Sequence, residues 1–198
     1  ADQECTLVED PPAPADRRGA VHRHRMLYAR RVATGDQPAG SIGTGEEGNE
    51  AQVVEVASLE ALTAMQAGEV RNKVVFINQR MERTKDGASY GTTVKNRTQG
   101  ASAAGNLGAV ALVIRSVGTS DERFAHTGRM AYDVSAPRIP AFSLSNPDAD
   151  TLSRQLKTNK QLRLRLKSTA REMPPAWSAN VIGEIPGTDP AGEILLLG

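Results

Sequence analysis

The chain has 198 residues, of which 39% are hydrophobic and 24% are charged. This composition is ordinary for a folded domain and argues against a wholly disordered chain or a membrane protein. The 24 lysines and arginines nearly balance the 23 acidic residues, and the net charge of +1 excludes an overall field that would attract DNA, RNA or anionic lipid. We therefore expect no nucleic-acid partner.

The cysteine content and the length of the apolar runs argue against a disulfide-stabilised domain, a cysteine-based metal cluster and a membrane-spanning protein. Cys5 is the single cysteine of the chain, so neither a disulfide framework nor a cysteine-based metal cluster is expected. The longest apolar stretches, residues 109–114 and 194–197, are far shorter than the ~20 residues that cross a bilayer. We expect no membrane span.

Residues 1–39 are expected to form a poorly ordered flank. Several prolines and a basic run over residues 17–31 leave no sustained apolar period in this segment. An interaction arm is the alternative interpretation of the basic run, because clusters of like charge also serve as binding tails.

Strands and helices alternate after this flank. The glycine-rich residues 41–48 predict a turn, and QVVEVA at 52–57 predicts a short strand. Ser58 is a suitable cap for a helix over residues 59–66, whose apolar side chains share one face. KVVFIN at 73–78 predicts a strand that is buried on both faces.

Two long polar loops are expected in the middle of the chain. Residues 79–93 and 116–138 have no apolar period, and connections of this length usually have a structural or functional reason. Between them, residues 94–108 predict a helix whose small side chains allow close packing on a sheet. Residues 109–115 then predict another buried strand, and this order of elements is typical of α/β proteins.

Strand, helix and strand follow the second loop. Residues 138–145 predict a strand, and the helix after it begins with a capping Ser145 and runs to about Lys157. Residues 161–169 alternate leucine with basic side chains, which predicts a strand with one exposed face. The resulting fold class is α/β (α+β).

Two further strands are expected after a pair of prolines at 174 and 175. WSANVIGEIPG at 177–187 and EILLLG at 193–198 are both rich in β-forming residues. Since the last run is entirely apolar, it needs covering on both faces, and we expect the chain to stop inside a larger fold.

The chemical groups form no catalytic motif. His22 and His24 lie among arginines that oppose metal binding, and His126 stands alone in the second loop. The chain has no GxSxG elbow, and its glycine-rich segment lacks the lysine of a phosphate loop. We therefore expect no catalytic residue, metal ligand or cofactor in this chain.

Five side chains in or beside the two long loops could hold an anionic group such as a peptide carboxylate. They are Tyr90, Arg97, Arg115, Arg123 and Arg129. Simple solvated arginines are the alternative interpretation.

Several stretches, in a fixed order, resemble the protease-associated domain inserted in zinc exopeptidases of the plasma glutamate carboxypeptidase type. They are GSIGTGEEG with AQVVEVASLEAL, NKVVFIN, NRTQGASAAGNLGAVALVIRSV, AHTGRMAYDVSAPRIPAFSLSNPDADTLSR and SANVIGEIPGTDPAGEILLLG. The similarity covers about residues 40–198, and its last stretch resembles the first two strands of the peptidase domain.

This resemblance implies a fold and a place in a larger enzyme. Residues 40–172 would form a swivelling β/β/α domain with a mixed β-sheet or partly open barrel and two to three helices. Residues 173–198 would be a terminal strand pair from a zinc peptidase domain that is truncated before its metal-binding residues. The parent would be a secreted, periplasmic or extracellular two-zinc aminopeptidase or carboxypeptidase, a hydrolase that binds zinc outside the covered chain.

The resemblance also implies a role for the domain and its partners. The domain would overhang the active-site cleft and shape substrate access, with Tyr90, Arg97 and Arg129 in contact with the substrate or a partner. The expected partners are the peptidase domain of the same polypeptide and a peptide substrate, and a homodimer is left open. The alternative function is a non-catalytic interaction module of a transferrin-receptor-like protein.

Overall fold

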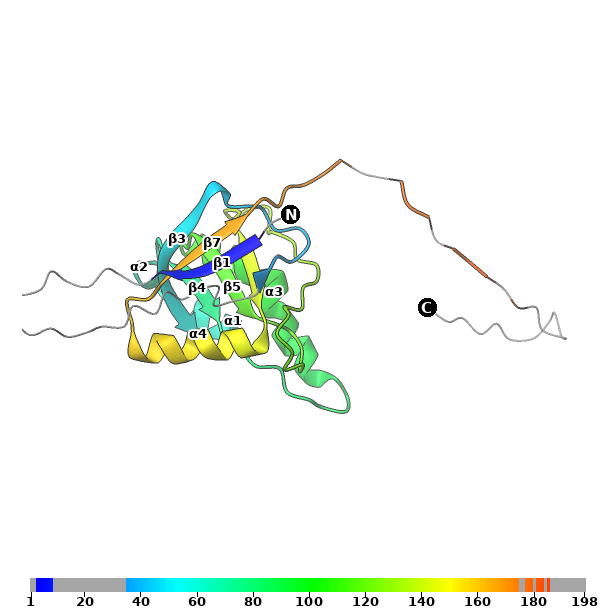
Figure 1. Ribbon diagram of the computed structural model, residues 1–198, viewed down its shortest axis with the longest axis horizontal. Coiled ribbons are helices and arrows are strands. Elements are labelled where there is room, and N and C mark those ends of the chain that lie inside the picture. The colour runs from blue at the N-terminus through cyan, green and yellow to red at the C-terminus, as the bar shows by residue number, and fades with distance from the viewer. Residues whose placement is uncertain (1–2, 9–34, 175–176, 180, 184, 186–198) are drawn as a thin grey trace, which may run out of the picture.

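The computed structural model describes residues 3–8, 35–174, 177–179, 181–183 and 185 (Figure 1). Seven strands form one curled sheet in the order β1-β7-β3-β4-β5-β6-β2. The strands are β1 (Gln3–Val8), β2 (Gly35–Asp36), β3 (Gly45–Val56), β4 (Val74–Ile77), β5 (Ala111–Arg115), β6 (Ala141–Leu144) and β7 (Arg163–Ser168). The helices are α1 (Leu59–Thr63), α2 (Ala67–Val70), α3 (Ala88–Asn106) and α4 (Asn146–Thr158).

Parallel strands form the centre of the sheet and antiparallel strands form its two ends. Strands β3, β4, β5 and β6 run parallel to one another, whereas β1, β7 and β2 are antiparallel to their neighbours. Every residue of β4, β5 and β6 is buried, as expected for strands covered on both faces. The predicted α/β (α+β) class is confirmed.

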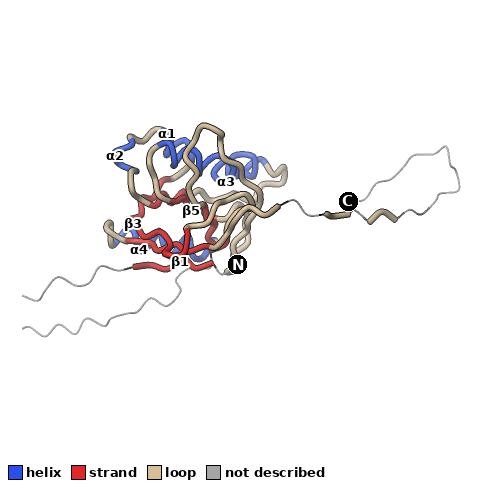
Figure 2. The backbone as a smooth tube through the Cα atoms, turned by 90° about the horizontal axis from the view of Figure 1, so that it is seen from above, coloured by secondary structure: helices blue, strands red, loops and turns tan. Residues whose placement is uncertain are grey.

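Helices cover the two faces of this sheet (Figure 2). Helix α4 packs on one face, where Phe76 and Phe142 join its leucines in one hydrophobic cluster. Helices α1 and α3 pack on the other face, where Ile77 and Leu112 belong to a second cluster. The two clusters take alternate residues of the same strands, because successive side chains of a strand point to opposite faces.

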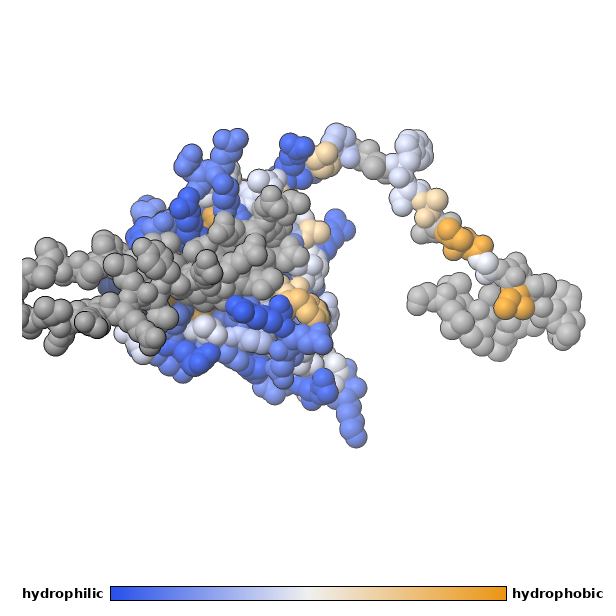
Figure 3. All heavy atoms as spheres, viewed as in Figure 1, coloured by the Kyte–Doolittle hydropathy of each residue, from blue (hydrophilic) through white to orange (hydrophobic). Residues whose placement is uncertain are grey.

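Small residues let α3 lie close to the sheet, as its sequence predicts. A Cβ on Gly100 would lie 3.0 Å from Leu112 Cδ2 and 3.2 Å from Ile77 Cδ1, so the helix surface and the strand side chains are already in contact. The visible face of the folded part is covered mainly by hydrophilic side chains (Figure 3). Among the described residues, no helix has the length and apolar character needed to cross a membrane.

The prediction of a loop over residues 79–93 was wrong for its second half. Helix α3 begins at Ala88, and the Asp86 carboxylate accepts a hydrogen bond from the Ala88 N–H at 3.1 Å. Thr93 Oγ1 donates to the Ser89 carbonyl within the helix. These first turns are mostly exposed and polar, so they carry no apolar period from which a helix could be predicted.

The prediction of a turn over residues 41–48 was also wrong for its second half. Strand β3 begins at Gly45, and its register against β7 shifts between Gly45 and Asn49. Gly48 has a φ of 77°, and a Cβ there would lie 2.7 Å from the Leu166 carbonyl oxygen. Glycine is therefore needed at this irregularity, which bends the strand without ending it.

Two strands come from the N-terminal segment. Strand β1 pairs with β7, and β2 pairs with β6, both antiparallel. The division of the chain into 1–39, 40–172 and 173–198 stays a prediction. The predicted strand at 193–198 lies outside the described residues, and the described residues within 177–187 are not in a strand.

The part of the chain that the structure describes has four helices, whereas the resemblance implies two to three. The additional element is α2, a single turn directly after α1. A capping box stabilises it, in which the Gln66 N–H donates to the Glu69 carboxylate at 2.9 Å. Such a short helix leaves little trace in the pattern of apolar residues.

Candidate functional site

Two segments that are far apart in sequence run side by side at one end of the sheet. The Ala39 N–H donates to the Gly128 carbonyl at 2.7 Å, and the Met130 N–H donates to the Ala39 carbonyl at 2.9 Å. Ala39 and Arg129 thereby form a parallel β-bridge. The bridge fixes the second half of the 116–138 loop against the segment that leads from β2 to β3.

Arg97 lies next to this bridge, at the inner side of the loop. Its residue surface is 8% exposed, and a Cβ on Gly128 would lie 2.5 Å from its Cζ atom. Nη2 donates to the Tyr90 hydroxyl at 3.2 Å, and Nη1 makes a long contact of 3.5 Å with the Thr127 carbonyl. Nε is buried and has no hydrogen-bond partner among the described residues. The guanidinium is therefore a buried cation with few partners.

The structure brings two of the three predicted contact residues together. Tyr90 and Arg97 form a direct hydrogen bond across seven residues of α3, and Tyr90 is 45% exposed. The backbone of Arg129 lies in the adjacent bridge, while its side chain is exposed. Arg115 and Arg123 belong to a separate cluster at the start of α4, where they contact Asn146 and Asp148.

Arg115 is the centre of this second cluster, at the carboxyl ends of the parallel strands. It is 4% exposed and ends β5. Its Nε donates to Asn78 Oδ1 at 2.7 Å, Nη1 donates to the Asn146 carbonyl at 3.1 Å, and Nη2 donates to Asp150 Oδ1 at 2.5 Å. One side chain thus joins the end of β4, the end of β5 and the start of α4.

The same edge anchors the 116–138 loop. Asn146 Nδ2 donates to the carbonyls of Gly118 and Ser120 at 3.0 and 2.8 Å. Arg123 Nε forms an ion pair of 2.8 Å with Asp148, whose side chain is almost fully buried. These contacts attach the first half of the loop to α4, and the bridge to Ala39 attaches its second half. The loop is long because it reaches both of these places.

The Asp150 carboxylate forms ion pairs with two arginines, Arg80 and Arg115. Burial raises the pKa of its carboxyl group, but hydrogen bonds from Arg115 and Arg80 outweigh burial and hold the pKa below the ordinary value of 3.8. Arg80 reaches this carboxylate at 2.8 Å and ties the start of the 79–87 loop to α4.

We expect Asp150 to make the unfolding free energy pH-dependent in acid. A carboxylate whose pKa is lowered in the folded state stabilises the fold above its unfolded pKa of 3.8, and this stabilisation disappears as the pH falls through the lower folded value. Urea unfolding below about pH 4 should therefore be less pH-dependent in Asp150→Asn than in the wild-type chain. Asp121→Asn, an exposed change in the loop, should keep the wild-type slope, and equal slopes in all three proteins would contradict the assignment.

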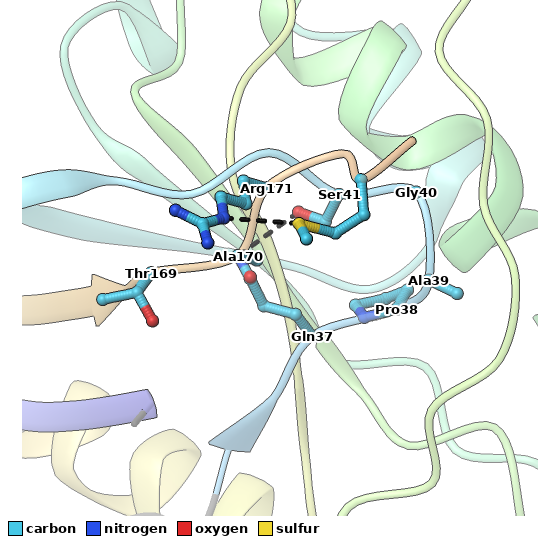
Figure 4. Close-up of a pocket in the computed structure, with 9 residues that line it drawn as sticks. Gln37, Pro38, Ala39, Gly40, Ser41, Thr169, Ala170 and Arg171 are labelled. Carbon is cyan, nitrogen blue, oxygen red and sulfur yellow. Dashed lines mark hydrogen bonds between the residues drawn. The ribbon is translucent and has the colours of Figure 1, made fainter. Parts of the chain in front are cut away.

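A hollow of about 600 Å³ opens between the segment that follows β2 and the segment that follows β7 (Figure 4). Residues 37–41 form one wall, and the chain leaving β7, residues 169–171 and Met173, forms the other. Gln37 links the two walls, because its Oε1 accepts a hydrogen bond from Ser168 Oγ at 2.5 Å. Its Nε2 donates to the Ile42 carbonyl at 3.0 Å and so holds the first wall in place.

Within the described ranges, no group of three or more His, Cys, Asp or Glu side chains could hold a metal ion.

The chain is similar to known peptidases. No protein-family model matches it. It is 35% identical over 157 residues to carboxypeptidase Q of Homo sapiens, and 37% identical over 158 residues to that of Rattus norvegicus. These matches take up 79% and 80% of this chain but 32% of each relative. Most of this chain is therefore similar to a part of these carboxypeptidases.

A solved structure supports the same relationship. A peptidase M28 precursor from Shewanella amazonensis SB2B has a TM-score of 0.71 and 34% sequence identity to this chain. The likeness covers 84% of this chain and 34% of that one. The chain therefore spans about a third of the length of the peptidases it matches, and the expected relationship to an exopeptidase is confirmed.

Sequence reasoning missed the partners of Arg115. Asn78 ends a predicted strand, and Asn146 and Asp150 lie in the first turns of a predicted helix. Since the carboxyl ends of parallel strands meet at one edge of a sheet, this rule could have grouped them.

Proposed function

We propose that this chain is the protease-associated domain of a two-zinc exopeptidase, a metallopeptidase with aminopeptidase or carboxypeptidase activity. The observation that carries the proposal is the match of 157 residues to carboxypeptidase Q, which takes up most of this chain and about a third of that protein. The remaining part of the parent polypeptide would then hold the zinc ions and the catalytic groups. The described residues do not offer a zinc site, so we assign no step of the reaction to them.

In this proposal the domain overhangs the active-site cleft and shapes substrate access. The loops at 79–87 and 116–138 are suited to form a wall, because they are tied to helix α4 and to each other. Arg80 bonds to Asp150, and Arg83 donates to Thr119 across the two loops at 3.4 Å. A wall held in this way can orient a peptide and exclude water without taking part in bond chemistry.

The proposed partners are the peptidase domain of the same polypeptide and a peptide substrate, and a homodimer is a further option. Secretion, or export to the periplasm or extracellular space, is proposed from the family resemblance. The support for the proposed location is the similarity to carboxypeptidase Q over most of the chain.

Zinc analysis of this chain and of the full-length polypeptide that carries it tests the proposal. After dialysis against zinc, the 198-residue chain should hold no stoichiometric zinc and should leave dipeptides and aminoacyl substrates intact. The full-length polypeptide should hold about two zinc ions and hydrolyse short peptides, because paired metals activate a water and polarise the scissile carbonyl.

Two outcomes would contradict this proposal. Tight zinc binding or peptide hydrolysis by the 198-residue chain alone would place chemistry in the domain itself. A full-length polypeptide without zinc or activity would favour the non-catalytic interaction module.

A further inference from the structure

Strand β3 has one edge that is paired along only part of its length. Strand β7 follows this edge up to the pair of Gln52 with Arg163, and a last hydrogen bond runs from the Val53 N–H to the Leu162 carbonyl at 2.9 Å. Beyond this point, residues 54–56 pair with β4 alone. The final part of β3 therefore keeps one open edge.

The backbone groups on the open edge follow from the pairing with β4. The Asn78 N–H donates to the Val56 carbonyl at 2.9 Å, so this carbonyl points toward β4. The C=O of one residue and the N–H of the next point in opposite directions across a trans peptide, so the Ala57 N–H points away from β4. By the alternation along a strand, the Glu55 N–H and C=O point to the same side. Among the described residues, no backbone group pairs with these donors and this acceptor.

A groove of about 500 Å³ lies along this edge. Residues 52–57 line it, together with Leu156 of α4, Lys160 and two residues that flank β4, Lys73 and Asn78. An open strand edge with a helix beside it is the arrangement to which an extended peptide adds as a further strand. The groove is thus suited to a segment that brings its own backbone N–H and C=O groups.

The charged side chains of the groove favour an acidic occupant. Lys73 is half-buried and Lys160 is exposed, and neither takes part in an ion pair within the described part of the chain. The Glu55 carboxylate already accepts hydrogen bonds from Asn78 Nδ2 at 2.5 Å and from Ser153 Oγ at 2.7 Å. The two lysines therefore give the groove a net positive charge, which acidic side chains complement.

We propose that the open edge of β3 binds an extended acidic segment of another protein, which joins the sheet as an additional strand. Backbone hydrogen bonds to Glu55 and Ala57 hold the segment, and ion pairs with Lys73 and Lys160 select acidic sequences. This interaction surface goes beyond the proposed peptidase function, because it needs no zinc and is formed by the described residues.

Hydrogen exchange of the ¹⁵N-labelled 198-residue chain tests the proposal. The probe is a blocked peptide of about five residues in which glutamate and valine alternate, long enough to span the open edge. At a peptide concentration of about ten times Kd, exchange of the Glu55 and Ala57 N–H groups should slow about tenfold. The N–H groups of Val54 and Val56 should keep their exchange rates, because they are already bonded to β4. This alternation is specific to the addition of a strand.

A proline variant tests the backbone contact. Ala57→Pro removes the outward N–H at an exposed position, and Ala57→Val keeps that N–H. We expect Ala57→Pro to weaken binding of the acidic peptide about fivefold, since one hydrogen bond is lost. Ala57→Val should bind the peptide like the wild-type chain.

Lysine variants test the charge preference and keep the proposal falsifiable if Ala57→Pro does not fold. The double variant Lys73→Gln with Lys160→Gln should bind the acidic peptide about tenfold more weakly, because two exposed ion pairs are lost. Lys167→Gln, an exposed change on β7 outside the groove, should leave binding unchanged. A peptide with lysine in place of glutamate should bind the wild-type chain much more weakly than the acidic peptide.

Three outcomes would overturn the proposed strand addition. The first is exchange at Glu55 and Ala57 that the acidic peptide does not slow. The second is equal binding of the acidic and the lysine peptide, which would remove the charge preference. The third is protection of the same two N–H groups without peptide that grows with protein concentration, which would make a second copy of this chain the occupant.

Discussion

Replacing Arg115 by methionine is expected to lower the free energy of unfolding by about 3 kcal/mol. The arginine side chain is 3% exposed and bonds to the ends of two strands and the start of α4. Its removal leaves Asn78 Oδ1 without this donor and takes one of the donors from the Asn146 carbonyl, and unpaired polar groups in buried surroundings are costly. Urea unfolding measured at pH 7 checks the value.

Arg163→Met is the matched control for this change. Arg163 is also a strand arginine with an acidic partner, but its ion pair with Glu50 is 38% and 37% exposed. Exposed pairs contribute about 0–1 kcal/mol, so the control should lose little stability. Equal losses in Arg115→Met and Arg163→Met would contradict a central role of the Arg115 cluster.

Gly105→Ala is the second large effect, with an expected loss of about 2 kcal/mol. Alanine normally stabilises a helix interior relative to glycine, so the sign of this effect depends on the surroundings. A Cβ on Gly105 would lie 2.5 Å from the Pro137 carbonyl oxygen. This contact is with backbone, which cannot move aside as a flexible side chain can, and α3 or the end of the 116–138 loop must shift.

Gly91→Ala provides the control within the same helix. A Cβ at Gly91 would have no neighbour within 4 Å. Only the helix propensity then changes, and the stability should rise by up to about 1 kcal/mol. Thermal or urea unfolding of the two variants should therefore give opposite signs, and stabilisation by Gly105→Ala would refute the close approach of Pro137 to α3.

The sequence alone determined the elements whose signals are local. The predicted strands at 73–78 and 109–115 are confirmed as β4 and β5. The helix caps are confirmed as well, because Ser58 Oγ accepts from the Ala61 N–H and Ser145 Oγ accepts from the Asp148 N–H. Side-chain period and capping hydrogen bonds act within a few residues, so they can be recognised without knowing the rest of the fold.

The tertiary structure decided the elements that depend on distant partners. Strands β1 and β2 exist through pairing with β7 and β6, which lie more than a hundred residues away in the sequence. The start of β3 is likewise held by β7, and its glycines suggest a turn when they are considered alone. A strand obtains its hydrogen bonds from a neighbour, and the neighbour is known only from the fold.

The sequence also determined some features of the candidate site, and the tertiary structure decided the others. The sequence identifies Tyr90 and Arg97 as possible ligands of an anionic group, but it predicts a loop at Tyr90 and therefore does not place the two residues on one helix. It contains no sign that Gly128 closes over the guanidinium or that Asp150 pairs with Arg115 and not with Arg97. Burial distinguishes Arg97 from a solvated arginine, and so does the lack of an acidic partner among the described residues. Both result from long-range packing of the 116–138 loop against α3.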